Sequence, residues 1–136
     1  MIHLFDIKLF GENYKLTNGK NISNNKGYDS QPYFYNDNII LFASTRNGQT
    51  DIAKYNVKDH KVSFINDTKN GGEYSPQKIP NSKNISAVRL DNDGLQRFYE
   101  YDFKKGKNKE IIPNLKVAYP SWYDKNTVIS SVIVND

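Results

Sequence analysis

The sequence predicts an all-β protein, a partial β-propeller of about three blade-equivalents, each a four-stranded antiparallel sheet within a repeat of about 44 residues. A proline recurs at this spacing, at Pro32, Pro76 and Pro120. A hairpin turn, Asn47-Gly48 or Asp93-Gly94, follows each of the first two prolines. No long stretch has the apolar periodicity of an amphipathic helix, and helical repeats of similar length would need one.

The composition agrees with one folded domain. The chain has 136 residues, of which 37% are hydrophobic and 13% aromatic, including ten tyrosines and seven phenylalanines. The mean hydropathy of −0.77 is low. Without the aromatic residues it would favour disorder, so the aromatic content indicates a folded β protein with a core of modest size.

Charge and cysteine content exclude several classes of function. The net charge is +4, and acidic and basic residues alternate except in the run 104–109, which predicts a solvated turn. No basic face with stacking aromatics is visible, so we expect no nucleic-acid partner. Without cysteine there is no thiol redox chemistry. We also expect no membrane span, and the first ten residues do not form a signal peptide.

The expected elements follow the chain in order. Residues 1–30 are expected to hold strands 3 and 4 of a split blade, and the complete blades are expected at 31–74 and 75–118. Residues 119–136 would supply the first strands of a further blade. Each proline is expected to open an inner strand. The other strands are expected at 4–7, 14–17, 39–44, 51–57, 61–65, 85–90, 96–103, 109–112 and 127–134.

Both hairpin turns are expected to be of type I′. Asn-Gly or Asp-Gly between alternating hydrophobic runs favours this turn, because both of its central residues need positive φ. A sandwich or meander is the alternative fold, but it would not repeat a proline and a turn at fixed spacing.

A closed propeller needs at least about four blades, which is more than this sequence supplies. The chain is therefore expected either to be a piece of a longer protein or to assemble. Two copies could complete each other's split blades. Open strand edges favour such self-association.

The stretch QPYFYNDNIILFASTRNGQTDIAKYNV resembles the WD-type (WD40-like) repeat of TolB-like propellers, with its S-x-R-x-G turn at residues 44–48 and Asp51-Ile52 after it. EYSP at 73–76 and VRLDNDGLQRFYEYDF at 88–103 are similar to the next blade of secreted or periplasmic TolB-like proteins of Bacteroidota type. The resemblance covers most of the chain. It implies a propeller and a periplasmic or extracellular location, and it specifies no single activity.

Catalytic residues are not expected within this chain. A serine nucleophile needs a nearby base, and the two histidines are His3, near the chain end, and His60, in a turn. The alternative is the propeller portion of a larger peptidase-like hydrolase, or of a lyase, whose catalytic residues lie outside this chain. The segment 91–94, Asp-Asn-Asp-Gly, predicts a turn better than a calcium loop, because Arg89 would stand at the first ligand position. No metal or cofactor is expected.

The topology of a propeller predicts a binding face around the channel mouth, where strand-4-to-strand-1 connections and strand-2-to-strand-3 turns meet. Tyrosine and arginine are enriched in binding hot spots. The alternative is structural, with tyrosines packed between blades and arginines paired with acids such as Asp51. We expect a non-catalytic binding module for a protein, peptide or glycan, with the candidate residues Tyr28, Asp29, Gln31, Arg46, Glu73, Tyr74, Ser75, Arg89 and Tyr119.

Overall fold

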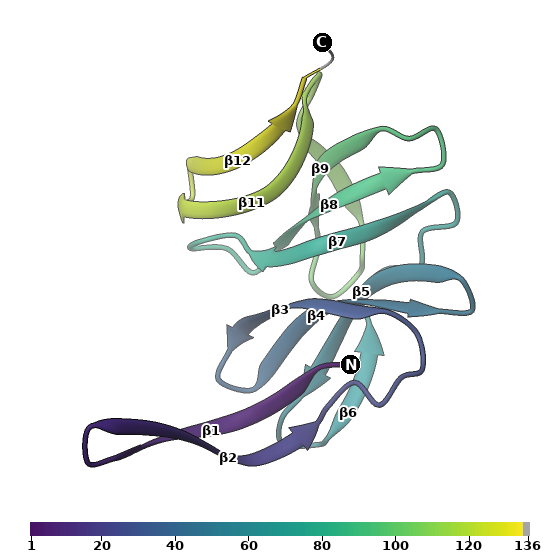
Figure 1. The fold of residues 1–136 in the computed structure, drawn as a ribbon. Helices are drawn as coiled ribbons and strands as arrows, with labels where there is room; N and C mark the ends of the chain where they lie inside the picture. Colours follow the sequence, from purple (N-terminus) through teal and green to yellow (C-terminus); the bar gives the residue numbers. More distant parts are fainter. Residues whose placement is uncertain (135–136) are drawn as a thin grey trace.

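The computed structural model describes residues 1–134. Over this range it contains twelve strands and no helix, so it also has no helix able to cross a membrane. All strand pairs are antiparallel, which confirms the all-β prediction. The strands form four sheets that stack in chain order from the N-terminus to the C-terminus (Figure 1).

Two complete four-stranded sheets occupy the middle of the molecule. The first, blade A, consists of β3 (Asp29–Asn36), β4 (Ile39–Arg46), β5 (Gln49–Asn56) and β6 (Lys61–Phe64). The second, blade B, consists of β7 (Gly71–Lys78), β8 (Ile85–Asp91), β9 (Gln96–Tyr101) and β10 (Asn108–Ile112). Two-stranded sheets flank them, formed by β1 (His3–Phe10), β2 (Asn13–Asn21), β11 (Lys116–Asp124) and β12 (Thr127–Ile133).

Within each complete blade the strands are neighbours in the same order as in the chain. Such up-and-down sheets, packed face to face in succession, are the blades of a β-propeller. The four sheets form an open series and do not close into a ring. The structure therefore shows the partial propeller that the sequence predicts.

The hydrophobic core lies between successive sheets. Alternation along β4 sends neighbouring side chains to opposite faces: Ile40 and Phe42 pack toward the N-terminal sheet, and Leu41 packs toward blade B. In blade B, Tyr99 faces blade A and Phe98 faces the C-terminal sheet. Each complete blade is therefore buried on both of its faces.

The two central hairpins use different turns. In blade A, Asn47 and Gly48 have φ values of 52° and 81°, as a type I′ turn requires. In the β8–β9 turn of blade B only Gly94 has positive φ, at 83°, so the predicted type I′ turn there is wrong. The backbone N–H of Asp91 donates to the carbonyl oxygen of Leu95, which leaves residues 92–94 in the loop. A loop of this length needs only one left-handed residue, which Gly94 supplies.

The inner strands do not begin at their prolines, contrary to the prediction. β3, β7 and β11 each start before the proline, and the register with the next strand shifts around it. The residue preceding each proline is left-handed: Gln31 has φ 58°, Ser75 has φ 51° and Tyr119 has φ 49°. A proline inside a strand is tolerated at a bulge or a strand edge, because it offers no N–H to the ladder. Each inner strand therefore carries a bulge at the same position.

The turns between the third and fourth strands have one design in both blades. The side chain of Asn56 accepts hydrogen bonds from the backbone N–H groups of residues 58 and 59, and Asp102 does the same for residues 104 and 105. Both turns end on a left-handed residue, His60 with φ 56° and Gly106 with φ 64°. Asn and Asp favour such turns because their side chains mimic a backbone acceptor.

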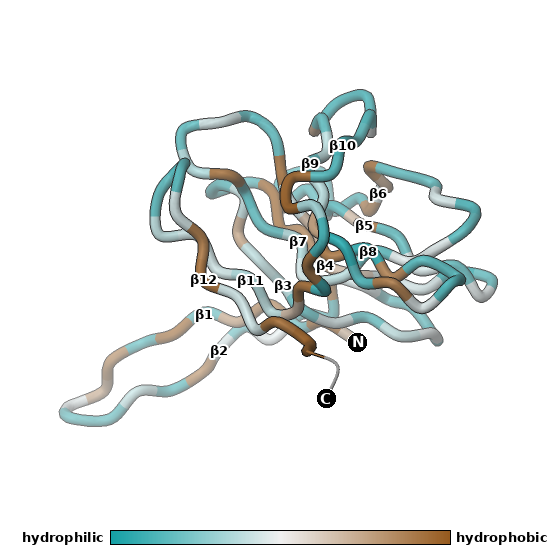
Figure 2. Tube along the Cα trace, turned by 90° about the horizontal axis from the view of Figure 1, so that it is seen from above, coloured by the Kyte–Doolittle hydropathy of each residue, from teal (hydrophilic) through white to brown (hydrophobic). Residues whose placement is uncertain are grey.

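The β1–β2 hairpin extends away from the rest of the molecule (Figures 1 and 2). Its register places Ile7 opposite Leu16 and Leu9 opposite Tyr14. These four side chains are between 61% and 70% exposed, so one face of the hairpin is apolar and uncovered.

Candidate functional site

The three bulges bring Gln31, Ser75 and Tyr119 to one place, although these residues lie far apart in the sequence. They line a cavity of about 440 Å³, here called the bulge cavity. They also line a neighbouring hollow of about 230 Å³, together with the three prolines. Non-glycine residues with left-handed backbone are costly and tend to cluster where a protein functions. The bulge cavity is lined by Tyr28, Gln31, Tyr74, Ser75, Val88, Leu90, Gln96, Ala118, Tyr119, Ser131 and Ile133.

Hydrogen bonds between sheets fix the bulges relative to one another. The backbone N–H of Ser75 donates to Oε1 of Gln31 over 2.8 Å, which joins blade B to blade A. Nε2 of Gln77 donates to the carbonyl oxygen of Pro120, which joins blade B to the C-terminal sheet. The cavity is therefore held by three sheets at once.

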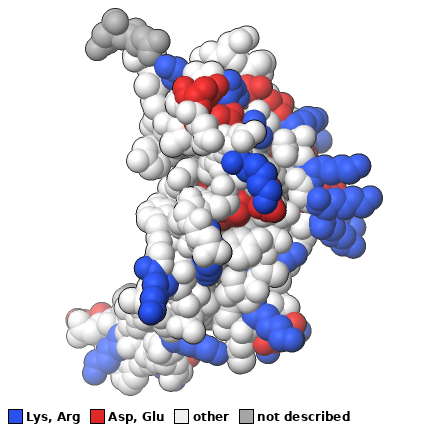
Figure 3. Space-filling model, turned by 90° about the vertical axis from the view of Figure 1, so that its right-hand side faces the viewer, with Lys and Arg blue, Asp and Glu red and all other residues white. Residues whose placement is uncertain are grey.

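Among residues 1–134, no acidic or basic side chain lines the bulge cavity. This is unusual in a chain that is 25% charged. Figure 3 shows one face of the molecule, on which lysine and arginine gather beside aspartate and glutamate and a broad uncharged area adjoins them. The cavity offers aromatic rings, amides, hydroxyls and apolar carbons.

Five of the nine predicted site residues line this cavity: Tyr28, Gln31, Tyr74, Ser75 and Tyr119. The rings of Tyr28 and Tyr74 meet edge to face, with their centroids 6.3 Å apart. The side chain of Tyr119 is 76% exposed. The tyrosines at this site are thus partly packed against each other and partly open to solvent.

Asp29 and Arg46 form a separate ion pair. Nη1 of Arg46 lies 3.2 Å from Oδ1 of Asp29, and the same oxygen accepts hydrogen bonds from Ser44 and Asn25. Burial alone would raise the pKa of Asp29, but the hydrogen bonds from Ser44, Asn25 and Arg46 outweigh it, so the pKa lies below its ordinary value. Both side chains are used in this ion pair, and neither lines the bulge cavity.

Glu73 lies in the interior and does not join its neighbours Tyr74 and Ser75 at the surface. Its side chain is fully buried, and Oε1 accepts hydrogen bonds from the hydroxyls of Thr68 and Tyr101. Oε2 has no hydrogen-bond partner. Burial raises the pKa of Glu73, and the bonds from Thr68 and Tyr101 offset only part of that rise.

Arg89 faces away from the bulge cavity. Its Nε lies 2.7 Å from Oδ1 of Asp91, and its guanidinium stacks 3.8 Å above the ring of Tyr99. Asp91 also pairs with Arg97. Both carboxylate oxygens of Asp91 are therefore used by arginine, and the described residues 1–134 contain no group of three or more acidic, histidine or cysteine side chains placed to hold a metal.

Six cavity residues were not predicted from the sequence. Val88 and Leu90 flank Arg89 on β8, and alternation sends them to the opposite face from Arg89. That alternation is a signal in the sequence that could have found them. The others are Gln96, Ala118, Ser131 and Ile133.

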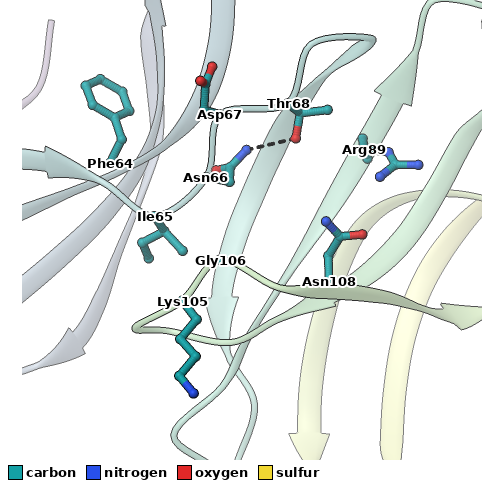
Figure 4. Close-up of a pocket in the computed structure, with 9 residues that line it drawn as sticks. All are labelled: Phe64, Ile65, Asn66, Asp67, Thr68, Arg89, Lys105, Gly106 and Asn108. Carbon is teal, nitrogen blue, oxygen red and sulfur yellow. Dashed lines mark hydrogen bonds between the residues drawn. The ribbon is translucent and has the colours of Figure 1, made fainter.

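A second hollow of about 600 Å³ lies between the end of β6 and the loop before β10 (Figure 4). Most of its polar side chains already have partners. The side chain of Asn66 bonds to Asp51 and Thr68, and Arg89 is paired with Asp91. Lys105 points away from the other labelled residues in Figure 4. This hollow is a seam between the two complete blades and offers little to a ligand.

The fold and the cavity define a class: a β-propeller-type scaffold with a cavity built from its inner strands. No protein-family model and no curated protein matches the chain. Among solved structures it is similar to TolB from Acinetobacter baumannii, with a TM-score of 0.61 and 20% sequence identity over 89% of this chain. The match spans 35% of that TolB chain. This likeness shows a TolB-like β-propeller fold.

Proposed function

We propose that the chain is a non-catalytic binding module that holds its partner in the bulge cavity. The observation that carries the proposal is the convergence of three left-handed, non-glycine residues, from three different sheets, on one uncharged cavity. Strained backbone at such a place is part of how sites are pre-organised. Tyrosines beside it supply the contact area typical of hot spots.

The proposed partner is a protein, a peptide or a glycan. The TolB-like fold supports a binding role, and a periplasmic or extracellular location is proposed from the same resemblance. The enzymatic alternative, a propeller attached to a hydrolase or lyase domain, would gain support from a Gly-x-Ser-x-Gly segment in adjoining coding sequence.

The test is a selection of binders from a displayed peptide library and from a glycan array, with the 136-residue chain as bait. Tyr119→Ala removes a ring that lines the cavity, and Tyr123→Ala is the matched control, because Tyr123 lies on the same strand, is 85% exposed and does not line the cavity. We expect Tyr119→Ala to weaken capture at least about tenfold. Binders that are equally sensitive to both variants, or to neither, would contradict the proposal.

Self-association is a second proposal, and the uncovered apolar face of the β1–β2 hairpin favours it. Exposed apolar faces and open strand edges promote association. Replacing Ile7 and Leu16 with lysine should shift the chain toward the monomer in size-exclusion chromatography with light scattering. Replacing Lys8, on the other face of β1, with alanine should leave the mass unchanged. A wild-type chain that is strictly monomeric would end this idea.

A further inference from the structure

We infer that the bulge cavity binds a neutral saccharide of one or two sugar rings. This inference rests on the proposed binding function and names the chemistry of the ligand. It depends on four properties of the cavity: its lack of charge, its exposed aromatic rings, its unused polar groups, and the structure of its strand edges.

The lack of charge selects against ionised ligands. Among residues 1–134, no acidic or basic side chain lines the cavity, although the chain carries 19 basic and 15 acidic residues. The charged residues Asp29 and Arg46 of the predicted site pair with each other and do not line the cavity. A carboxylate or ammonium group bound here would lose water without gaining an opposite charge, which is unfavourable.

The aromatic rings offer surfaces that suit sugars. The side chains of Tyr119 and Tyr28 are 76% and 48% exposed, so their rings are open to a ligand. A pyranose ring has a flat side of C–H groups that packs on an aromatic face, whose electron density is negative. The apolar side chains of Val88, Leu90 and Ile133 extend this surface.

Polar groups beside these rings are left for a ligand. Oε1 of Gln31 is used by the N–H of Ser75, while no hydrogen bond within residues 1–134 uses the Gln31 amide nitrogen or the Ser75 hydroxyl. An amide donor and a hydroxyl match the hydroxyl groups of a sugar, which both donate and accept. A few placed polar groups within an apolar lining are typical of small-molecule sites.

The strand edges at the cavity argue against an extended peptide. A peptide that adds to a sheet edge needs a continuous row of backbone N–H and C=O groups. Here Pro32, Pro76 and Pro120 remove an N–H from each inner strand, and the bulges shift the register beside them. The volume of about 440 Å³ suits a compact ligand. The cavity therefore fits a short glycan better than a strand of polypeptide.

The experiment uses saturation-transfer NMR and calorimetry with the 136-residue chain. The probes are neutral disaccharides, namely maltose, cellobiose, N-acetyllactosamine and diacetylchitobiose. Two of them have charged matches with the same number of rings: cellobiouronic acid is the anionic match of cellobiose, and the de-N-acetylated chitobiose is the cationic match of diacetylchitobiose. We expect at least one neutral probe to bind and its charged match to bind at least about tenfold more weakly.

Two variants locate the binding. Tyr119→Ala should weaken it at least about tenfold, while the control Tyr123→Ala should leave it within about twofold. Gln31→Glu keeps the acceptor for Ser75 and replaces the amide donor with a negative charge, so it should also abolish binding. Because Gln31→Glu preserves the bond between blades, it tests the site even if Tyr119→Ala fails to fold, which thermal melting would reveal.

The outcomes separate the two claims. If none of the neutral disaccharides binds, but selected peptides bind with a dependence on Tyr119, the saccharide inference is overturned and the proposed function stands. If neither peptides nor saccharides depend on Tyr119, both are overturned. Binding of a neutral probe that Gln31→Glu and Tyr119→Ala both remove would establish the inference.

Discussion

The two complete blades have the same strand order but hold a buried carboxylate in different ways. Asp29 in blade A and Glu73 in blade B each stand three residues before the proline of the inner strand. Asp29 faces a cation, Arg46, and several donors. Glu73 has two hydroxyl donors. Each carboxylate has one oxygen without a hydrogen-bond partner, Oδ2 of Asp29 and Oε2 of Glu73.

The direction of the pKa shift depends on the depth of burial and on the partners together, because Glu73 is fully buried whereas Asp29 keeps a small exposed fraction and pairs with Arg46. Burial disfavours the charged form of both carboxylates. In blade A the donors and the cation of Arg46 outweigh that effect and lower the pKa of Asp29, whereas in blade B they do not, and the pKa of Glu73 rises. Blade A is therefore stabilised by the ionised form of Asp29, whereas the interior of blade B favours the protonated form of Glu73.

A second difference lies in the turns between the third and fourth strands. His60 and Gly106 have the same left-handed backbone at equivalent positions. His60 is exposed, and its Nδ1 lies 3.0 Å from the hydroxyl of Tyr55. A Cβ on Gly106 would instead overlap the backbone carbonyl oxygen of Ile65 in blade A. The blade B turn therefore packs its backbone against the preceding blade, whereas the blade A turn reaches the preceding sheet through a side chain, with Nδ1 of His60 3.0 Å from Nζ of Lys20.

The largest expected effect comes from disrupting the backbone packing of the blade B turn. Gly106→Ala should destabilise the chain by about 3 kcal/mol, because it adds an overlap with rigid backbone and places a side chain in a left-handed conformation. His60→Ala, at the matched position, should cost less than about 1 kcal/mol. Urea unfolding of both variants measures the free energies. Similar losses would show that the two turns pack alike.

The next effect tests the ion pair of blade A. Asp29→Asn should cost about 2 kcal/mol at pH 7, because hydrogen bonds to a charged group are lost and Arg46 is left without its partner. Since the pKa of Asp29 is lowered from 3.8, this stabilisation is present above pH 3.8 and is lost as the pH falls through the folded-state pKa. Unfolding free energies measured from pH 7 to pH 2 should converge for wild type and variant. A constant difference across this range would contradict the assignment.

The smallest effect, of opposite sign, is expected in blade B. The pKa of Glu73 is raised from 4.5, so above pH 4.5 the folded state holds a proton that the unfolded state releases, and stability falls as the pH rises toward the folded-state pKa. The slope is at most about 1.4 kcal/mol per pH unit. Glu73→Gln should remove this slope. The same denaturation series gives the pH dependence of the unfolding free energy that each carboxylate contributes. If Asp29 and Glu73 contributed slopes of the same sign, the contrast between the blades would be wrong.

Much of the architecture could be predicted from local chemistry. The turn at Asn47-Gly48 follows from the ability of these residues to adopt positive φ, and alternating apolar runs predicted the strands on either side of it. The bulges could not be predicted in the same way. A proline shows that a ladder is interrupted, but it does not show whether the strand begins there or continues past it.

Only part of the candidate site was predicted. The topology of the loops indicates which residues come together, but it does not indicate where their side chains point. The prediction placed the consecutive residues Glu73, Tyr74 and Ser75 on one surface, whereas alternation turned Glu73 inward. Arg89 was expected at the channel mouth, but from β8 it faces blade A, where it stacks on Tyr99. Only the packed structure decides which face of each strand is interior.

The sharing of each hydrophobic cluster between two consecutive sheets has a consequence for folding cooperativity. Because each cluster is formed by two sheets together, the stability of each sheet depends on its immediate neighbours, as in linear repeat arrays. Amide hydrogen exchange should therefore be graded along the molecule. It should be slowest in β4 and β8, whose side chains enter clusters on both faces, and fastest in β1 and β2. Loss of one terminal sheet would then loosen the adjacent blade before the distant one.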